Sequence, residues 1–160
     1  MSKAVLASVR PLYCYYYAIG RKTLELRKTC PKLDGPFKVY IYSTKGNENL
    51  IRGDIATTID YVAMYGGRVV GEFVCDTILR NCEKANADIA EAQSCVKREK
   101  ILEYSGGHEV FGWHVSDLVI YDTPKELSEF SGLRQTKFGL EPVSLKRPPQ
   151  SWCYVESEEK

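Results

Sequence analysis

The chain has 160 residues, of which 44% are hydrophobic and 27% are charged, a composition typical of a soluble globular protein with one buried core. Its 22 Lys and Arg residues nearly balance its 21 Asp and Glu residues and give a formal net charge of +1, which argues against a protein that coats long nucleic acids through a broad basic surface. Because no apolar run approaches the length of a membrane span and no secretory signal is visible, we expect a cytoplasmic protein with no membrane partner.

The cysteines and glycines give no indication of a metal or cofactor. The six cysteines, at positions 14, 30, 75, 82, 95 and 153, include no Cys-x-x-Cys pair, and the chain has only two histidines. We therefore expect no metal site, and without a glycine-rich phosphate-binding loop we expect no cofactor. A reducing cytosol keeps thiols free, so the cysteines are predicted to be free, several of them buried.

The beginning of the chain predicts a strand followed by a helix. Residues 3–9 form an apolar run that indicates a buried strand, and Pro11 suits the first turn of a helix over residues 11–19. The tyrosines of this helix either pack as an aromatic face or line a pocket. Gly20 fits the end of the helix, because that position usually needs a positive φ.

Residues 20–27, Gly-Arg-Lys-Thr-Leu-Glu-Leu-Arg, lead from this helix into a second strand. From Thr23 onward polar and apolar side chains alternate, so that Thr23, Glu25 and Arg27 share one face of the strand. Lys22 lies at the junction, and the spacing allows a Lys, a Glu and an Arg to converge on one groove. An ordinary solvated strand face is the alternative interpretation.

The middle of the chain predicts two further strands. Residues 37–44 are rich in aromatic and β-branched side chains and indicate a strand, which a polar loop over residues 45–49 follows. A short helix is predicted over residues 58–65. Residues 68–79 are the longest strand candidate, and Gly71 within them indicates a bulge or a close backbone approach.

The next segments alternate between surface structure and regular elements. Residues 81–93 are polar and rich in alanine, and they predict a partly mobile surface excursion. A helix over residues 94–104, ended by two glycines, and a strand over residues 110–121 are predicted after it.

The end of the chain predicts little regular structure. Residues 123–126 resemble a capping box that opens a short helix, and residues 131–146 indicate a polar loop. Residues 147–155 predict a rigid approach and a last strand, and the acidic tail over residues 156–160 is predicted to fray. Since no repeat or linker is visible, we expect a single domain over residues 1–160 with its core at about 3–155.

Several short pieces of the sequence, specific when taken in order, are similar to one known family. They occupy residues 8–11, 20–27, 39–42, 70–73, 113–117 and 147–152. Together they resemble the ASCH domain, a member of the PUA-like superfamily, over most of the chain. The resemblance implies an α+β fold, a small PUA-like β-barrel of about five to six strands with helices packed against it. It also implies a cleft beside residues 20–27 that binds RNA or a nucleotide.

Carried over to this sequence, the resemblance places Lys22, Glu25 and Arg27 at the cleft. The two cations are suited to a phosphate or a base carbonyl. Glu25 either accepts a hydrogen bond from an exocyclic amine or fixes the two cations. Arg10 either adds a second guanidinium, with its forked pair of hydrogen-bond donors, to the cleft or forms a surface ion pair. Tyr42 and Trp152 are candidates for stacking a base, with core packing as the alternative.

Some ASCH proteins are enzymes, which leaves an alternative function open. One branch resembles amidohydrolases that remove the acetyl group from N4-acetylcytidine with a Lys and a Thr. Lys22 matches that Lys, whereas Glu25 occupies the position of the nucleophile and Thr23 is a poor substitute, so Lys22 and Glu25 are the catalytic candidates if the protein is an enzyme. Another branch is similar to a ribonuclease for which a Ser near the barrel is relevant, and Ser116 is the candidate for that position. The alternative, which is more frequent for a lone Ser in a strand, is that its hydroxyl makes a structural hydrogen bond.

We therefore predict a protein that binds RNA, a nucleotide or a modified nucleoside in a cleft. The alternative is a hydrolase that acts on a modified nucleoside or on RNA. A regulatory interaction module is the third interpretation.

Overall fold

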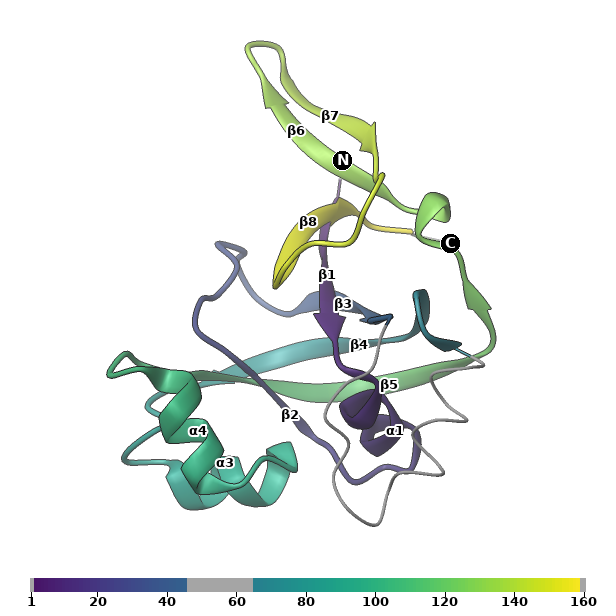
Figure 1. Cartoon of the computed structure of the whole chain (residues 1–160). Helices are drawn as coiled ribbons and strands as arrows, with labels where there is room; N and C mark the ends of the chain where they lie inside the picture. Colours follow the sequence, from purple (N-terminus) through teal and green to yellow (C-terminus); the bar gives the residue numbers. More distant parts are fainter. Residues whose placement is uncertain (1, 46–64, 159–160) are drawn as a thin grey trace.

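The computed structural model describes residues 2–45 and 65–158, and within these ranges it shows strands interspersed with short helices (Figure 1). Residues 58–64 of the predicted helix and residues 46–49 of the predicted loop lie outside the described residues. In chain order the elements are β1 (Lys3–Val9), α1 (Pro11–Ala18), β2 (Leu24–Arg27), β3 (Phe37–Ser43), β4 (Arg68–Leu79), α3 (Ala87–Ser94), α4 (Arg98–Ser105), β5 (Phe111–Lys125), the 3-10 helix η1 (Leu127–Glu129), β6 (Ser131–Thr136), β7 (Gly139–Ser144) and β8 (Trp152–Glu156).

The described strands form one mixed sheet of eight strands in the order β2-β5-β4-β3-β1-β8-β6-β7. β1 pairs in parallel with β3 and antiparallel with β8, and the remaining pairs are antiparallel. The α+β class is therefore confirmed. The pairings leave β2 and β7 at the two ends, so the described strands exceed the predicted number and do not close a barrel.

The strands and the helix predicted from regular patterns are present. β1, α1, β3 and β4 lie where the apolar run over residues 3–9, Pro11 and the strand-type composition of residues 37–44 and 68–79 predicted them. The close backbone approach predicted at Gly71 is confirmed, because a Cβ at this position would lie 2.5 Å from the carbonyl oxygen of Val119 in the neighbouring strand. A register shift beside Gly71 accompanies this contact and helps the long β4–β5 pair to bend.

The segment between β4 and β5 is regular, which corrects the prediction of a partly mobile excursion over residues 81–93. Residues 87–94 form α3, and α4 starts at Arg98 rather than at residue 94 because Cys95 has a left-handed backbone conformation that ends α3. Cys82 and Ala90 are fully buried in a small cluster with Leu24 of β2. The small alanine side chains that made the sequence look featureless allow this close packing.

Two predictions for the end of the chain are also wrong. Residues 131–146 contain the paired strands β6 and β7 instead of a loop, and this hairpin projects from the rest of the fold in Figure 1. A projecting hairpin buries few side chains, so its sequence lacks the alternation typical of a strand. The capping box lies at Glu126 and Glu129, where it opens η1, whereas Thr123 belongs to β5.

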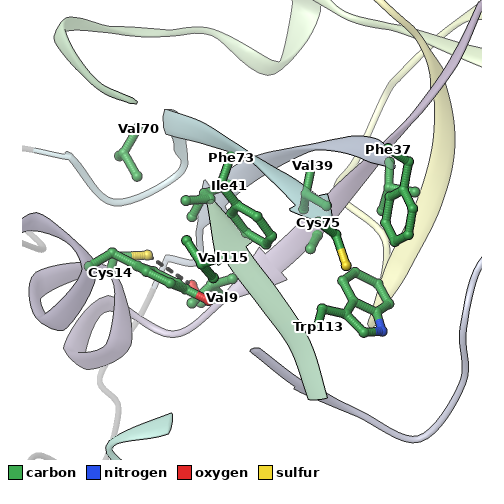
Figure 2. Close-up of a cluster of buried hydrophobic side chains, with 13 residues drawn as sticks. Val9, Cys14, Phe37, Val39, Ile41, Val70, Phe73, Cys75, Trp113 and Val115 are labelled. Atoms are coloured by element: carbon green, nitrogen blue, oxygen red, sulfur yellow. Dashed lines mark hydrogen bonds between the residues drawn. The ribbon is translucent and has the colours of Figure 1, made fainter. Parts of the chain in front are cut away.

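The main core lies between α1 and the central strands of the sheet (Figure 2). Trp113 of β5, Phe73 of β4 and Tyr17 of α1 are each at most 1% exposed. Trp113 meets the ring of Phe37 edge to face, with centroids 5.7 Å apart, an arrangement that aromatic pairs favour. This core fixes the position of α1 beside β2. In the described ranges no helix is both long enough and apolar enough to pass through a bilayer.

All six cysteines are free thiols, and their burial predicts a graded reactivity. Burial raises the pKa of Cys14 and Cys75 to about 12 and that of Cys82 to about 11. Since the thiolate is the reactive form, we expect these thiols to react with a maleimide at neutral pH only after unfolding. Mass spectrometry of the labelled native and unfolded protein measures this difference. Rapid labelling of Cys14 in the native protein would contradict the packing of α1.

Candidate ligand-binding groove

An open groove of about 940 Å³ runs past α1, β2, α4 and the segment that precedes β8. Its lining contains more basic than acidic side chains. The basic ones are Arg10, Lys22, Arg27, Lys28 and Lys100, and the acidic ones are Glu25 and Glu103. Tyr13 and Tyr104 also line it. This local charge is compatible with the near-neutral net charge, because the basic residues gather at one place.

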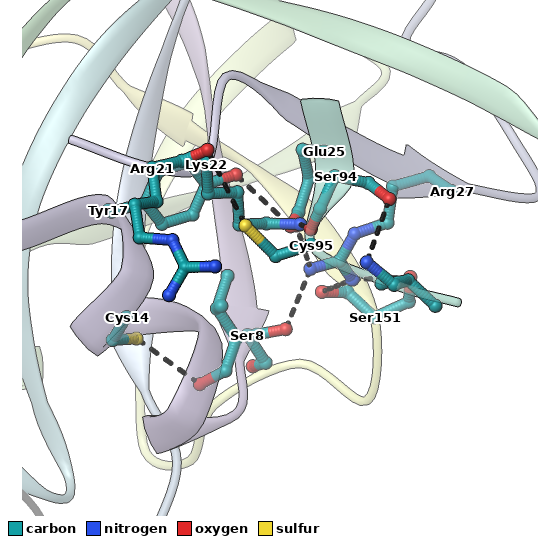
Figure 3. Close-up of polar contacts among 12 residues, drawn as sticks. Ser8, Cys14, Tyr17, Arg21, Lys22, Glu25, Arg27, Ser94, Cys95 and Ser151 are labelled. Atoms are coloured by element: carbon teal, nitrogen blue, oxygen red, sulfur yellow. Dashed lines mark hydrogen bonds and ion pairs between the residues drawn. The ribbon is translucent and has the colours of Figure 1, made fainter. Parts of the chain in front are cut away.

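Three charged residues of β2 and the turn before it form a buried ionic cluster, Lys22, Glu25 and Arg27 (Figure 3). Their exposed fractions are only 2%, 4% and 7%. Lys22 Nζ lies 3.8 Å from Glu25 Oε1, and Arg27 Nη2 lies 3.3 Å from Glu25 Oε2. Tyr17 donates a hydrogen bond of 3.2 Å to Glu25 Oε1. The alternative of a solvated strand face is therefore wrong.

Arg27 links β2 to two distant parts of the chain. Its Nη1 donates hydrogen bonds to the carbonyl oxygen and the hydroxyl of Ser151, at 3.0 and 3.1 Å, and its Nη2 donates to the carbonyl oxygen of Ser8 at 2.8 Å. Within the described part of the chain, its Nε is a buried donor with no partner. The planar guanidinium thus ties the end of β1 and the start of β8 to the acidic centre of the cluster.

Lys22 occupies an aromatic, largely dry environment. Its Nζ donates a hydrogen bond of 2.7 Å to the carbonyl oxygen of Ser94 at the end of α3. It also lies 4.9 Å from the ring centroid of Tyr13 and 5.5 Å from that of Tyr17. Burial lowers the pKa of the Lys22 amine below its usual range, an effect that the nearby Glu25 carboxylate partly offsets. A lowered pKa increases the fraction of the amine that is neutral, which is the form that can act as a base or a nucleophile.

Two of the remaining sequence candidates lie at or beside the groove. Arg10, the residue that precedes α1, lines it. Trp152 donates a hydrogen bond of 2.9 Å from its indole to Thr29 Oγ1, and its ring meets Trp113 edge to face. The ring of Trp152 is not among the described groove-lining residues, although Ser151 and Thr29 beside it are.

The structure does not bring the other two candidates to the groove. Tyr42 is 3% exposed and packs in a core cluster on β3 with Tyr40 and Phe130. Ser116 of β5 donates its hydroxyl hydrogen bond to the carbonyl oxygen of Val74 at 2.9 Å. Neither belongs to the described lining of the groove. These placements favour the structural alternatives, core packing and a satisfied hydroxyl.

The contribution of α4 to the groove was not predicted from the sequence. Lys100 and Tyr104 of this helix both line the groove, and Lys28 Nζ lies 4.5 Å from the ring centroid of Tyr104. A spacing of four residues places Lys100 and Tyr104 on the same helix face. That spacing, within a helix the sequence did predict, was the available signal.

No family model and no curated protein matches the sequence. Among solved structures, the fold is similar to crystal structures of an ASCH protein from Zymomonas mobilis, with 16% identity, a TM-score of 0.59, and coverage of 97% of this chain and 89% of that chain. Two point variants of that protein match with 16% and 15% identity, TM-scores of 0.60, and coverage of 98% and 97% of this chain and of 93% and 89% of theirs. The chain therefore has the fold of the ASCH proteins.

Proposed function

We propose that this protein binds RNA or a nucleotide in the groove beside β2. The observation that supports the proposal is the concentration of five basic side chains along a groove whose floor is the buried ionic cluster. Phosphate groups are attracted to such a groove, and charge-assisted hydrogen bonds to them are stronger than neutral ones. The ASCH fold agrees with this proposal, because the family is generally associated with RNA.

We assign different roles to the floor and the rim of the groove. The cluster already satisfies most of its own hydrogen bonds, so Lys22 and Arg27 act as a rigid, positively charged floor. Both oxygens of Glu25 accept contacts within the cluster, so we infer that Glu25 fixes the two cations rather than recognising an amine. Arg10, Lys28 and Lys100 at the rim supply the contacts to phosphate.

Substitution of a rim residue tests the proposal without disturbing the cluster. We expect Arg10→Gln to weaken the binding of a labelled RNA oligonucleotide or of a nucleotide by about 1.5–3 kcal/mol, the range for a hydrogen bond that involves a charged group. Fluorescence anisotropy titration measures the loss. Lys137→Gln, on the exposed turn of the β6–β7 hairpin, is the control. Equal losses in the two variants would mean diffuse electrostatic attraction rather than binding in the groove.

A hydrolase that acts on a modified nucleoside is the second candidate, and one observation favours it. Burial lowers the pKa of Lys22, and this residue lines the groove. In the hydrolysis of N4-acetylcytidine, water adds to the acetyl carbonyl, the C–N bond breaks, and acetate and cytidine leave. A neutral Lys22 amine can take the proton from that water. Chromatography of protein incubated with N4-acetylcytidine tests this, with Lys22→Met as the inactive variant. Release of cytidine that persists in Lys22→Met would rule out this role.

A further inference from the structure

The part of the groove lining that α4 contributes presents an exposed aromatic ring. Tyr104 lies on α4, is 39% exposed and lines the groove. The ammonium of Lys28 lies over its ring, 4.5 Å from the centroid. Lys100, one helical turn before Tyr104, lines the same part of the groove. An aromatic ring and two cations, contributed by α4 and by the residue after β2, thus lie together beside the ionic cluster.

The helix that holds this ring is firmly packed. Ile101 of α4 is 1% exposed and belongs to a buried cluster with Leu24 of β2 and Ala90 of α3. At its end, Gly106 adopts the left-handed conformation and donates a backbone hydrogen bond to the carbonyl oxygen of Leu102, which terminates the helix regularly. Tyr104 therefore projects from a helix that is fixed to the rest of the fold, so a ligand that stacks on its ring does not have to order the backbone first.

We propose that Tyr104 and Lys28 form a stacking subsite for an unpaired nucleobase, with Lys100 contacting the adjoining phosphate. This inference rests on the proposed function and adds the ligand's chemical class, a single-stranded oligonucleotide. Every base has a π-face that can stack on an aromatic side chain. Cations beside the ring can contact the phosphate backbone of the same strand. A base in a duplex is already stacked on both faces and cannot occupy such a site.

The size of the groove agrees with a ligand longer than one nucleoside. Its volume of about 940 Å³ is near the upper end of the range of about 300–1,000 Å³ for small-molecule sites. One unit can occupy the floor above the ionic cluster while the next stacks on Tyr104. The simpler alternative is that the contact between Lys28 and Tyr104 only holds α4 against β2.

Two RNA probes separate stacking from phosphate attraction. One is a labelled single-stranded RNA of mixed sequence, and the other is an abasic ribose–phosphate oligomer of equal length, each titrated by fluorescence anisotropy at several salt concentrations. We expect Tyr104→Leu to weaken RNA binding by about 5- to 100-fold, without changing the salt dependence or the binding of the abasic oligomer. Tyr104→Phe keeps the ring and should keep the affinity.

Lys100→Gln should behave in the opposite way. We expect it to weaken both probes similarly and to reduce the slope of the logarithm of affinity against the logarithm of salt concentration by about one. Phe138→Leu, which changes a 90% exposed aromatic residue at the turn of the β6–β7 hairpin, is the matched control and should change nothing. If urea unfolding shows that Tyr104→Leu is unstable, Tyr104→Met supplies a second variant without a ring.

Unchanged RNA affinity in Tyr104→Leu, or an equal loss for the abasic oligomer, would overturn the stacking subsite. If Arg10→Gln still weakens binding in that case, the proposed function stands and only the subsite fails. If the unaltered protein binds neither RNA nor a nucleotide, the proposed function fails together with it.

Discussion

Glu25→Gln is expected to lower the free energy of unfolding by about 3–5 kcal/mol, the usual cost of removing one partner from a buried ion pair. Glu25 is 4% exposed and is the acidic centre between Lys22 and Arg27. The neutral amide is nearly the same size, so the effect isolates the charge. Without the carboxylate, two cations remain together in a poorly solvated place. Urea denaturation followed by circular dichroism measures the change.

The control for this prediction is Glu141→Gln. Glu141 pairs with Arg134 on the exposed β6–β7 hairpin, where the two side chains are 43% and 66% exposed. Exposed pairs contribute at most about 1 kcal/mol, so a much smaller change is expected. Similar changes in the two variants would show that water reaches the cluster and that it is not a buried ionic site.

The loss in free energy of unfolding caused by Glu25→Gln should also depend on pH. Burial lowers the pKa of Lys22, so the charged amine is costly in the folded state. A cost of this sign is fully present below the folded pKa and disappears as the pH rises beyond the unfolded pKa. Loss of Glu25 lowers the folded pKa further and enlarges the cost. Repeating the denaturation at alkaline pH should therefore narrow the difference between the variant and the unaltered protein. A difference that widened with pH would contradict this account.

Arg27→Met is expected to have the second largest effect and to lower the free energy of unfolding by about 3 kcal/mol. The substitution leaves the carbonyl oxygens of Ser8 and Ser151 without the guanidinium that joins β1, β2 and the start of β8. Glu25 still has Lys22 and Tyr17 as partners, so the loss should be smaller than that of Glu25→Gln. Urea denaturation again measures it. Arg134→Met on the exposed hairpin is the matched control.

The double variant Glu25→Gln/Arg27→Met tests whether the two residues act together. Each single change leaves its partner unpaired. We therefore expect the loss in free energy of unfolding of the double variant to be about 1–3 kcal/mol smaller than the sum of the losses of the two single variants. Strict additivity would contradict the contact between them. These costs also mean that substitutions in the cluster cannot report on ligand binding alone, so the rim residues are the better probes.

Much of the fold was predictable because its signals are local. An apolar run and strand-type composition predicted β1, β3 and β4, Pro11 and Gly20 bounded α1, and the order of short motifs indicated the ASCH fold. The alternation in residues 20–27 also identified the charged residues of β2 as a group. Each of these inferences depends on neighbours in the chain, whose spacing follows from helix and strand geometry.

The nature of the groove depended on contacts between residues far apart in the chain. Ser151, which accepts from Arg27, is 124 residues away from it, and Ser94, which accepts from Lys22, is 72 residues away. Only this packing turns a polar strand face into a buried cluster. It also places Tyr104 at the groove and keeps Tyr42 and Ser116 in other parts of the sheet. The sequence by itself determined the elements with strong local signals and the charged residues of β2, whereas tertiary packing decided which side chains meet, because burial and ion pairing depend on distances that chain spacing does not specify.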